Sequence, residues 1–303
     1  MFKLAKPFFI KTITPMHAGS GQDLGIVDQP IQRERHTSYP KIEGSSLKGS
    51  IREVFRENIG KEEITKDKIN LVFGPESGDT HAGSLGFTDA RILFFPVKSV
   101  KGTFAWITCS DILKKFKKDL KISKSSVNLE NIPNPDNGKF IAASNSKNVV
   151  EKDNKIFLIL EEYTFENAEN NFDFDKLDKL IPETVNKEQI VILSNDDFKD
   201  FVNLSTEVIT RTKIDPQTGT VKAGALFTEE YLPAETIIYS LAMTTTVFKE
   251  NREKLPLKNE NHVMEFFKEI PETIQIGGNA TIGKGIVEIV KWDSVLKDGG
   301  KDE

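Results

Sequence analysis

The chain has 303 residues, a length that suits one large domain with insertions. Hydrophobic residues make up 38% of it and charged residues 29%, so it can bury a core and stay in solution. No window approaches about 18 consecutive apolar residues, which excludes a transmembrane helix, and the N-terminus lacks the features of a secretory signal. A single cysteine, Cys109, excludes an internal disulfide and a cysteine-rich zinc site. We therefore predict a cytoplasmic protein with no membrane partner.

The net charge of −5 argues at first against a nucleic-acid partner, but the charge is unevenly distributed. Residues 33–56 and 98–124 are rich in lysine and arginine, whereas residues 160–200 are mainly acidic. Such a chain can hold phosphate on one face and a protein neighbour on another. Charge alone favours an ordinary solvated surface.

Hydrophobic periodicity alternates between strand-like and helix-like segments along the chain, which predicts an α+β protein. Strands are expected at 8–14, 85–95, 103–109, 156–163, 207–213, 237–246, 273–276 and 286–291. Helices are expected at 46–59, 66–73, 111–120, 175–180, 196–204 and 262–270. The clearest helix is 46–59, where Leu47, Ile51 and Phe55 share one face and Ser45 or Ser46 can cap the start.

Three stretches lack a core pattern. Residues 15–41 form a long polar loop, and residues 123–154, dominated by Asn, Ser, Lys and Pro, are expected to be a mobile insertion. Residues 211–225 contain two β-capable arms joined by DPQTG, a strong turn signal, and so polar a hairpin is expected to project as an arm. No internal repeat or linker is visible, so residues 1–303 are treated as one domain.

Two glycine-marked segments are candidates for binding phosphate. In GSSLKGS, the helix start around Ser46 offers free backbone N–H groups, with Lys48 and Arg52 in the first turns. This segment is not a P-loop, so nucleotide hydrolysis is unsupported. In IGGNATIGKG, Gly277, Gly278 and Lys284 can approach a sugar–phosphate chain. The alternative for this second segment is a hairpin turn that needs glycine for its geometry only.

Catalysis is harder to derive, because no serine-hydrolase elbow, zinc-protease motif or acidic pair with metal-ligand spacing is present. The candidates in the first loop are His17, Asp23, Asp28, Glu34 and His36. A lone aspartate in a polar loop is usually a turn or cap residue. Asp28 differs in setting, because small apolar residues on both sides can fix its position while its carboxylate stays free.

Six segments occur in an order that resembles a known family: MHAGSGQDLGIVDQPIQRERHT, YPKIEGSSLKGSIRE, LFFPVKSVKG, LSTEVITRTKID with TGTV, LFTEEYLP and QIGGNATIGKG. Together they resemble the repeated backbone subunits of type III-B CRISPR (Cmr) effector complexes, which belong to the RAMP superfamily. The resemblance covers almost the whole chain except residues 123–154 and the tail after Trp292.

The resemblance implies a ferredoxin-like, RRM-related core with a lid at about 15–42, a variable insertion at about 123–154 and a β-hairpin thumb at about 207–226. It also implies a role in prokaryotic antiviral defence. Copies would stack helically along a guide CRISPR RNA, together with other Cmr subunits. Complementary single-stranded target RNA would be cut at regular intervals, beside each thumb.

The resemblance also implies roles for individual residues. Asp28 occupies the catalytic position, and His17, Glu229 and Tyr231 match accessory positions. Glu229 and Tyr231 can also be explained as a strand-edge acid and a packed aromatic. The expected RNA contacts are Lys48, Ser46, Arg52, Arg211, Gly277, Gly278 and Lys284.

The expected reaction is metal-dependent cleavage, in which the RNA 2′-OH attacks the phosphorus and no covalent enzyme intermediate forms. Asp28 would either accept the 2′-OH proton or hold a divalent cation, Mg²⁺ or Mn²⁺, and the sequence leaves both roles open. His17 would protonate the leaving oxygen. RNA phosphates and water would complete the metal site.

Three other functions remain. A non-catalytic RNA-binding scaffold subunit of the same complex would have the same fold. A guide-processing endonuclease of the superfamily would act alone on precursor RNA, usually through a histidine base. A metabolic α+β enzyme is the third, although no nucleotide or metal motif supports it.

Overall fold

The computed structural model describes residues 2–22, 25–61, 64–76, 81–125, 129–169, 171–222, 224–248 and 254–294. Its strands are β1 (Leu4–Thr12), β2 (Lys41–Ile42), β3 (Leu85–Phe87), β4 (Ala90–Lys98), β5 (Phe104–Cys109), β6 (Lys139–Ala142), β7 (Val149–Lys152), β8 (Lys155–Leu160), β9 (Tyr163–Asn167), β10 (Ile190–Leu193), β11 (Glu207–Arg211), β12 (Phe227–Tyr231), β13 (Ile237–Thr244), β14 (Thr273–Gln275) and β15 (Ile286–Lys291).

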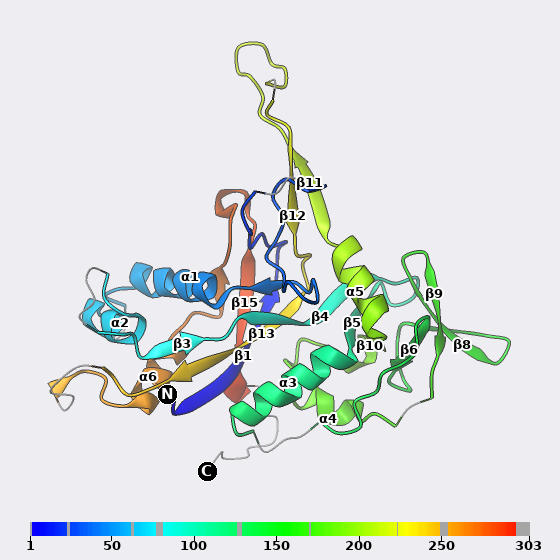
Figure 1. The fold of residues 1–303 in the computed structure, drawn as a ribbon, viewed down its shortest axis with the longest axis horizontal. Helices are drawn as coiled ribbons and strands as arrows, with labels where there is room; N and C mark the ends of the chain where they lie inside the picture. Colours follow the sequence, from blue (N-terminus) through cyan, green and yellow to red (C-terminus); the bar gives the residue numbers. More distant parts are fainter. Residues whose placement is uncertain are drawn as a thin grey trace.

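The α-helices are α1 (Gly44–Glu57), α2 (Lys66–Phe73), α3 (Ser110–Ile122), α4 (Phe174–Asp178), α5 (Asn195–Leu204) and α6 (Glu260–Lys268). Short 3₁₀ helices are η1 (Lys187–Gln189), η3 (Ala280–Ile282) and η4 (Trp292–Ser294). The fold is therefore mixed α/β, as the periodicity predicted (Figure 1). Within the described ranges, no helix combines the length and the hydropathy needed to cross a bilayer.

Most strands join one curled sheet in the order β14-β15-β1-β13-β4-β5-β10-β6-β9-β8-β7, and the short β2 and β3 pair with β4 and β13. In the run β15-β1-β13-β4, each strand is antiparallel to its neighbours. Beyond β5, the sheet continues through β10, which is parallel to β5. The segment between α3 and α5, which contains β6 to β10, thus extends the central antiparallel sheet on one side.

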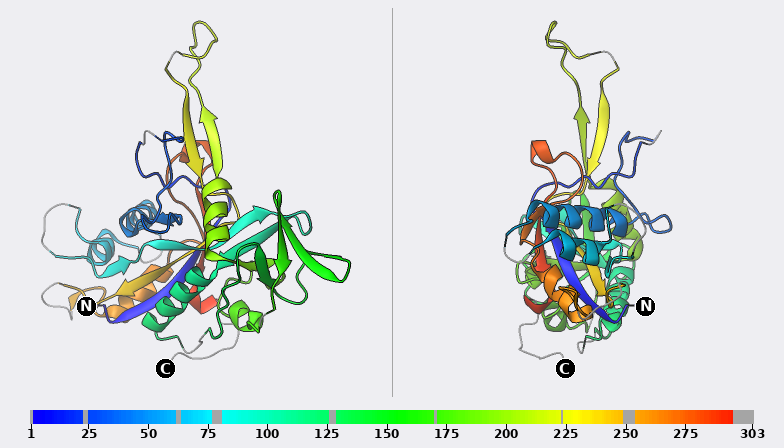
Figure 2. Two further views of the ribbon diagram at one scale, coloured as in Figure 1. Left: turned by 45° about the vertical axis from the view of Figure 1, so that its right-hand side comes forward. Right: turned by 90° about the vertical axis from the view of Figure 1, so that its left-hand side faces the viewer.

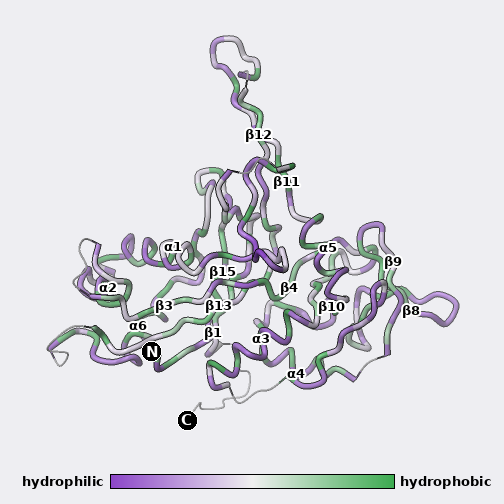
Figure 3. The backbone as a smooth tube through the Cα atoms, viewed as in Figure 1, coloured by the Kyte–Doolittle hydropathy of each residue, from purple (hydrophilic) through white to green (hydrophobic). Residues whose placement is uncertain are grey.

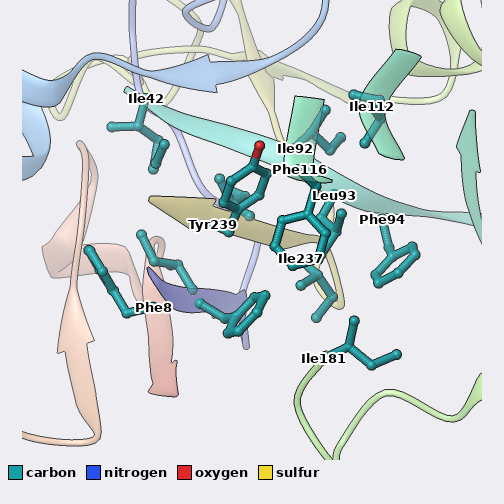
Figure 4. Packing of buried hydrophobic residues seen from close by; sticks show 14 of the residues in the cluster. Phe8, Ile42, Ile92, Leu93, Phe94, Ile112, Phe116, Ile181, Ile237 and Tyr239 are labelled. Atoms are coloured by element: carbon teal, nitrogen blue, oxygen red, sulfur yellow. The ribbon is translucent and has the colours of Figure 1, made fainter. Parts of the chain in front are cut away.

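The core lies where β1, β13 and β4 meet helix α3. Residues on both faces of β13 are buried, as expected for a central strand that is covered on each side. Figure 4 shows Phe8, Phe94, Phe116 and Tyr239 packed in this region. The Tyr239 hydroxyl donates to Asp119 Oδ2 at 2.8 Å, so the polar atom of this buried side chain is satisfied.

Helix α1 forms with the predicted buried face, but the predicted cap is wrong. Leu47, Ile51 and Phe55 are buried, yet the helix starts at Gly44 and its N-cap residue, Glu43, makes no capping hydrogen bond with its side chain. The Gly44 N–H instead donates to Asp89 Oδ1 at 2.9 Å. A β-carbon at Gly44 would lie 2.9 Å from the carbonyl oxygen of Phe87, so close packing against β3 sets where the helix begins.

The predicted mobile insertion at 123–154 is wrong for the part that enters the sheet. It contains β6 and β7, and its Phe140 and Ile141 are 0% and 2% exposed. Strand β6 pairs with β10 and β9, which lie far away in the sequence. Strand β10 was itself missed. The predicted strand 156–163 is two strands, because the chain turns at Glu161 with a φ of 50°.

Strands β11 and β12 form an antiparallel arm that stands away from the body of the molecule (Figures 1 and 2). The sequence predicted a strand at 207–213 and a polar hairpin at 211–225; the ladder joins 207–211 to 227–231, at the root of the arm. Nearer the tip, a single bridge joins Ile214 and Val221. The arm carries both hydrophilic and hydrophobic residues, as Figure 3 shows, and its Val208, Ile214, Val221 and Leu226 are each at least half exposed.

Candidate RNA interface and cleavage site

The lid segment that carries Asp28 lies against the outer edge of β12. The N–H of Gln29 donates to the carbonyl of Thr228 and the N–H of Glu230 donates to the carbonyl of Gln29, both at 3.0 Å. Gln29 and Glu229 thereby form a parallel bridge. The lid thus adds a third strand-like segment to the root of the arm, so the position of Asp28 depends on the position of β12.

The Asp28 carboxylate is held by Thr228. Its Oδ2 accepts the Thr228 N–H at 2.7 Å and the Thr228 hydroxyl at 2.9 Å, while the Asp28 N–H donates to that hydroxyl at 3.0 Å. These bonds, led by the backbone N–H, hold the pKa of Asp28 below its ordinary value. The side chain is otherwise exposed. Asp28 therefore presents an oriented, ionised carboxylate at the surface.

A second cluster contains Glu229, Tyr231 and Arg211. Glu229 Oε2 accepts from Arg211 Nε at 2.6 Å and from the Tyr231 hydroxyl at 2.7 Å, and Arg211 Nη2 donates to the same hydroxyl at 2.6 Å. Asn279 Nδ2 donates to Glu229 Oε1 at 3.1 Å and to the Tyr231 oxygen at 3.0 Å. Lys284 Nζ lies 4.9 Å from the centre of the Tyr231 ring.

This cluster is largely closed within the chain. Tyr231 is fully buried and Glu229 is 5% exposed, which agrees with a packed aromatic but not with a strand-edge acid. Burial raises the pKa of Glu229, but hydrogen bonds from Tyr231, Asn279 and Arg211 outweigh it and leave the pKa below its ordinary value. The Arg211 guanidinium is already occupied, so an RNA contact by Arg211 stays a prediction.

Strand β12 separates the predicted catalytic residues into two groups. Side chains alternate along a strand, so Glu229 and Tyr231 lie on one face, and Thr228 and Glu230 lie on the other. In the described part of the chain, Asp28 bonds only to Thr228, and no hydrogen bond or ion pair joins it to the cluster of Glu229, Tyr231 and Arg211.

His17 lies with the Tyr231 group, its ring centre 5.5 Å from that of Tyr231. Its Nδ1 lies 2.7 Å from the Glu230 carbonyl oxygen, which can only accept, so Nδ1 carries the proton and Nε2 is left as the free ring nitrogen. The residue is only 9% exposed. Its backbone carbonyl accepts the Gly278 N–H at 2.9 Å.

Gly277 is required by this close approach. Its φ is +88°, and a β-carbon there would lie 2.4 Å from the carbonyl oxygen of His17. Backbone geometry therefore explains why residue 277 is a glycine, as the hairpin-turn alternative for IGGNATIGKG proposed. An RNA contact by Gly277 or Gly278 stays a prediction.

Lys48 and Arg52 form a cationic pair on α1 that has no anionic partner among the residues that the structure describes. They are four residues apart and face the same way. Within the described ranges neither makes an ion pair, and Arg52 Nη2 is buried without a hydrogen-bond acceptor. Burial, and then the Arg52 guanidinium, lower the pKa of Lys48. An anion such as phosphate would relieve both effects.

The lid contacts the start of α1 beside this pair. Gln32 Nε2 donates to Ser46 Oγ at 3.3 Å, and Gln32 Oε1 accepts the Glu43 N–H at 2.7 Å. The structure therefore brings the predicted Ser46, Lys48 and Arg52 corner next to the lid that carries Asp28.

Among the described residues, no group of three or more His, Cys, Asp or Glu side chains is arranged to hold a metal ion. Asp28 Oδ1 is the one oxygen of the site with no bond to another described residue. Asp28 could therefore give a hard cation one protein ligand, and the other ligands would have to come from outside the chain. Asp23, another candidate from the first loop, lies outside the described residues.

Sequence reasoning missed Thr228 and Glu230. Both stand in FTEEY, the motif that supplied Glu229 and Tyr231. Strand alternation across that motif would have placed them together on the opposite face. The partnership of Thr228 with Asp28, 200 residues away, left no local signal.

Comparison with known proteins agrees with the sequence resemblance. The model of the RAMP superfamily matches residues 9–288. The CRISPR system Cmr endoribonuclease Cmr4 of Pyrococcus furiosus is 38% identical over 300 residues, which covers 95% of this chain and 96% of that protein. The chain belongs to the Cmr4 family of the RAMP superfamily. The Cmr4 subunit of Saccharolobus solfataricus is a more distant member, 26% identical over 96% of this chain and 97% of its own length.

Solved Cmr4 structures have the same fold. The crystal structure of oligomeric Cmr4 from Pyrococcus furiosus superposes with a TM-score of 0.72 at 32% identity, over 96% of this chain and 98% of that one. A chain in the cryo-EM structure of the type III-B Cmr-beta complex bound to cognate target RNA gives 0.72 at 27% identity, over 97% and 99%. The resemblance drawn from the six sequence segments is confirmed.

Proposed function

We propose that this Cmr4-family chain is a guide-RNA-binding backbone subunit of a type III-B complex, and that it cuts complementary target RNA at regular intervals. The observation that carries the nuclease role is the fixed, exposed Asp28 carboxylate at the root of the arm. The endoribonuclease activity named for the Pyrococcus furiosus relative supports it. The partners would be guide CRISPR RNA, single-stranded target RNA, further copies of the chain and other Cmr subunits, in the cytoplasm of a prokaryote.

We further propose that the core is ferredoxin-like and that the β11–β12 arm is the thumb. The elements β1, α1, β4, β13, α6 and β15 follow the β-α-β-β-α-β sequence of that fold. Their sheet order, β15-β1-β13-β4, places the first and third strands side by side in the centre. The arm would separate guide from target locally, and Asp28 at its root would then meet the exposed target backbone.

Asp28 acts in this proposal as an ionised carboxylate, not as a general base. A carboxyl group with a lowered pKa is a weak acceptor for the 2′-OH proton, whereas the Thr228 bonds leave Oδ1 free to hold a cation. A bound Mg²⁺ or Mn²⁺ would neutralise the charge that develops on the reacting phosphate. The chain supplies orientation: Thr228 fixes the carboxylate, and β12 carries both residues.

His17 takes the accessory role. Its Nδ1–H donates to the Glu230 carbonyl, which orients the ring and leaves Nε2 as the atom that can hold a proton for a leaving oxygen. Because the ring is mostly buried and lies across β12 from Asp28, we assign the direct contact with the target to Asp28.

The nuclease and scaffold functions differ in one assay. Complex reconstituted with Asp28→Asn should bind guide RNA normally and fail to cut complementary RNA, and EDTA should stop cutting by the unsubstituted complex. Asp136→Asn is the matched control, because Asp136 is also an exposed aspartate and, among the described residues, its side chain pairs only with Lys139. Cutting by Asp28→Asn at the unsubstituted rate would establish the scaffold function instead.

The guide-processing function is tested separately. The isolated chain, incubated with repeat RNA, should leave it intact. A specific cut by the isolated chain would show that it matures its own guide.

A further inference from the structure

Glu230 is a buried carboxylate that no sequence signal singled out. Its side chain is 7% exposed and faces away from the Tyr231 group. Its Oε2 accepts the Ile31 N–H at 3.0 Å, and its Oε1 accepts the Thr206 hydroxyl at 2.8 Å and pairs with Arg33. The carboxylate thus binds donors from the lid on one side and from the base of β11 on the other.

Arg33 extends this connection to α5. Its Nη1 donates to the carbonyls of Ser38 and Val202, at 2.9 and 3.0 Å, and to Asn203 Oδ1 at 3.0 Å. Glu230 and Arg33 therefore join the lid to β12 and to the segment where α5 ends and β11 begins, about 170 and 200 residues away in the sequence. A buried pair satisfied by so many hydrogen bonds fixes geometry, because breaking it leaves an uncompensated charge.

We propose that Glu230 is a positioning residue for target cleavage. It holds the lid segment that carries Asp28 in a fixed position relative to the root of the arm. Residues 28–31 run beside β12, and the Ile31 N–H bond to Glu230 fixes the end of that segment. Thr228 fixes its other end through Asp28. This inference rests on the proposed function, because it assigns Glu230 a role in the reaction that Asp28 performs.

The test substitution is Glu230→Gln. Glu230 uses both oxygens as acceptors, and a glutamine offers one oxygen and an NH₂ group, so either the Ile31 N–H or the Arg33 and Thr206 donors lose their acceptor. A displacement of about 1 Å can lower a rate about 100-fold. We expect a fall of about 10- to 100-fold in the single-turnover cleavage rate at saturating target. The half-saturating target concentration, guide binding and complex assembly should not change.

Glu34→Gln is the matched control. Glu34 is also a nearly buried lid carboxylate, 10% exposed at its side chain, and it pairs with Lys115 Nζ at 2.6 Å and with Arg91 Nε at 3.6 Å. These ion pairs hold the lid to α3 and β4, whereas the bonds of Glu230 hold it to the root of the arm. Glu34→Gln should lower the melting temperature about as much as Glu230→Gln does and leave the cleavage rate within about twofold of that of the unsubstituted complex.

Thr206→Val provides a second variant that keeps the shape and removes a single hydroxyl donor. It should lower the rate about fivefold, the equivalent of one hydrogen bond. The double substitution with Glu230→Gln should be no slower than Glu230→Gln alone. This variant decides the matter if Glu230→Gln does not fold.

The results separate the two proposals. Loss of rate with Glu230→Gln but not with Glu34→Gln, at unchanged half-saturation, supports the positioning role. Equal rates for the two variants, or an unchanged rate with Thr206→Val, would overturn it. Continued cutting by Asp28→Asn would instead overturn the proposed function.

Discussion

The cationic pair on α1 yields a quantitative prediction for guide binding. Lys48 has no acidic partner among the described residues, so its whole charge is available to an RNA phosphate. Replacing Lys48 by alanine should remove one phosphate contact. For single-stranded nucleic acid, each contact contributes about 0.7 to the slope of the logarithm of affinity against the logarithm of salt concentration.

The magnitude follows from that slope. Across a fourfold rise in salt, one contact accounts for a loss of about 2.6-fold in affinity. Lys48→Ala should therefore bind guide RNA more weakly than the unsubstituted chain at low salt, and the difference should shrink by about 2.6-fold over that range. Lys48→Ala combined with Arg52→Ala should reduce the slope by about 1.4.

Fluorescence anisotropy of labelled guide RNA over a salt series measures both quantities. Lys118→Ala is the control, because Lys118 is an exposed lysine on a different helix, α3. It should leave the affinity and the slope as they are. An unchanged affinity and slope with Lys48→Ala would show that Lys48 does not contact RNA. It would refute the inference that a lysine without an acidic partner among the described residues binds a phosphate.

Three further outcomes follow. Gly277→Ala should destabilise the chain by about 1–3 kcal/mol, measured by denaturant unfolding, because its positive φ is strained and its β-carbon meets the His17 carbonyl; unchanged stability would contradict that contact. Burial raises the pKa of Glu207, so its contribution to stability is full at acid pH and is lost as pH rises through the raised pKa. Glu207→Gln should therefore raise the melting temperature at neutral pH, with a gain that vanishes on acidification; a gain constant with pH would contradict this. Phe140→Ala should cost about 3–5 kcal/mol, and Val100→Ala, at an exposed position, less than about 0.5 kcal/mol; a small loss at Phe140 would contradict its place in the core.

Local patterns predicted much of the fold. Helix α2 and strand β15 have the predicted bounds, since each has a clear hydrophobic period and a nearby cap or turn. The error at 123–154 has a physical cause. Phe140 and Ile141 are two apolar residues among polar ones, and only pairing with β10, some 50 residues later, buries them. Periodicity in a short window does not report such long-range pairing.

The sequence identified residues of the site but not how they are arranged in space. The motif resemblance supplied Asp28, His17, Glu229 and Tyr231. It did not show that β12 separates Asp28 from the other three, because that separation depends on the register in which the lid pairs with β12. Glu230 was missed for the same reason: its partners come from the lid and the arm base, and only the tertiary fold brings them together.

The most direct test of the central claim is a map of the cuts made in a guide-complementary RNA by reconstituted complex. Evenly spaced cuts that disappear with Asp28→Asn, while guide and target remain bound, are the predicted result. Cuts that persist with Asp28→Asn at the same positions and rate would show that the carboxylate held by Thr228 does not perform the cleavage.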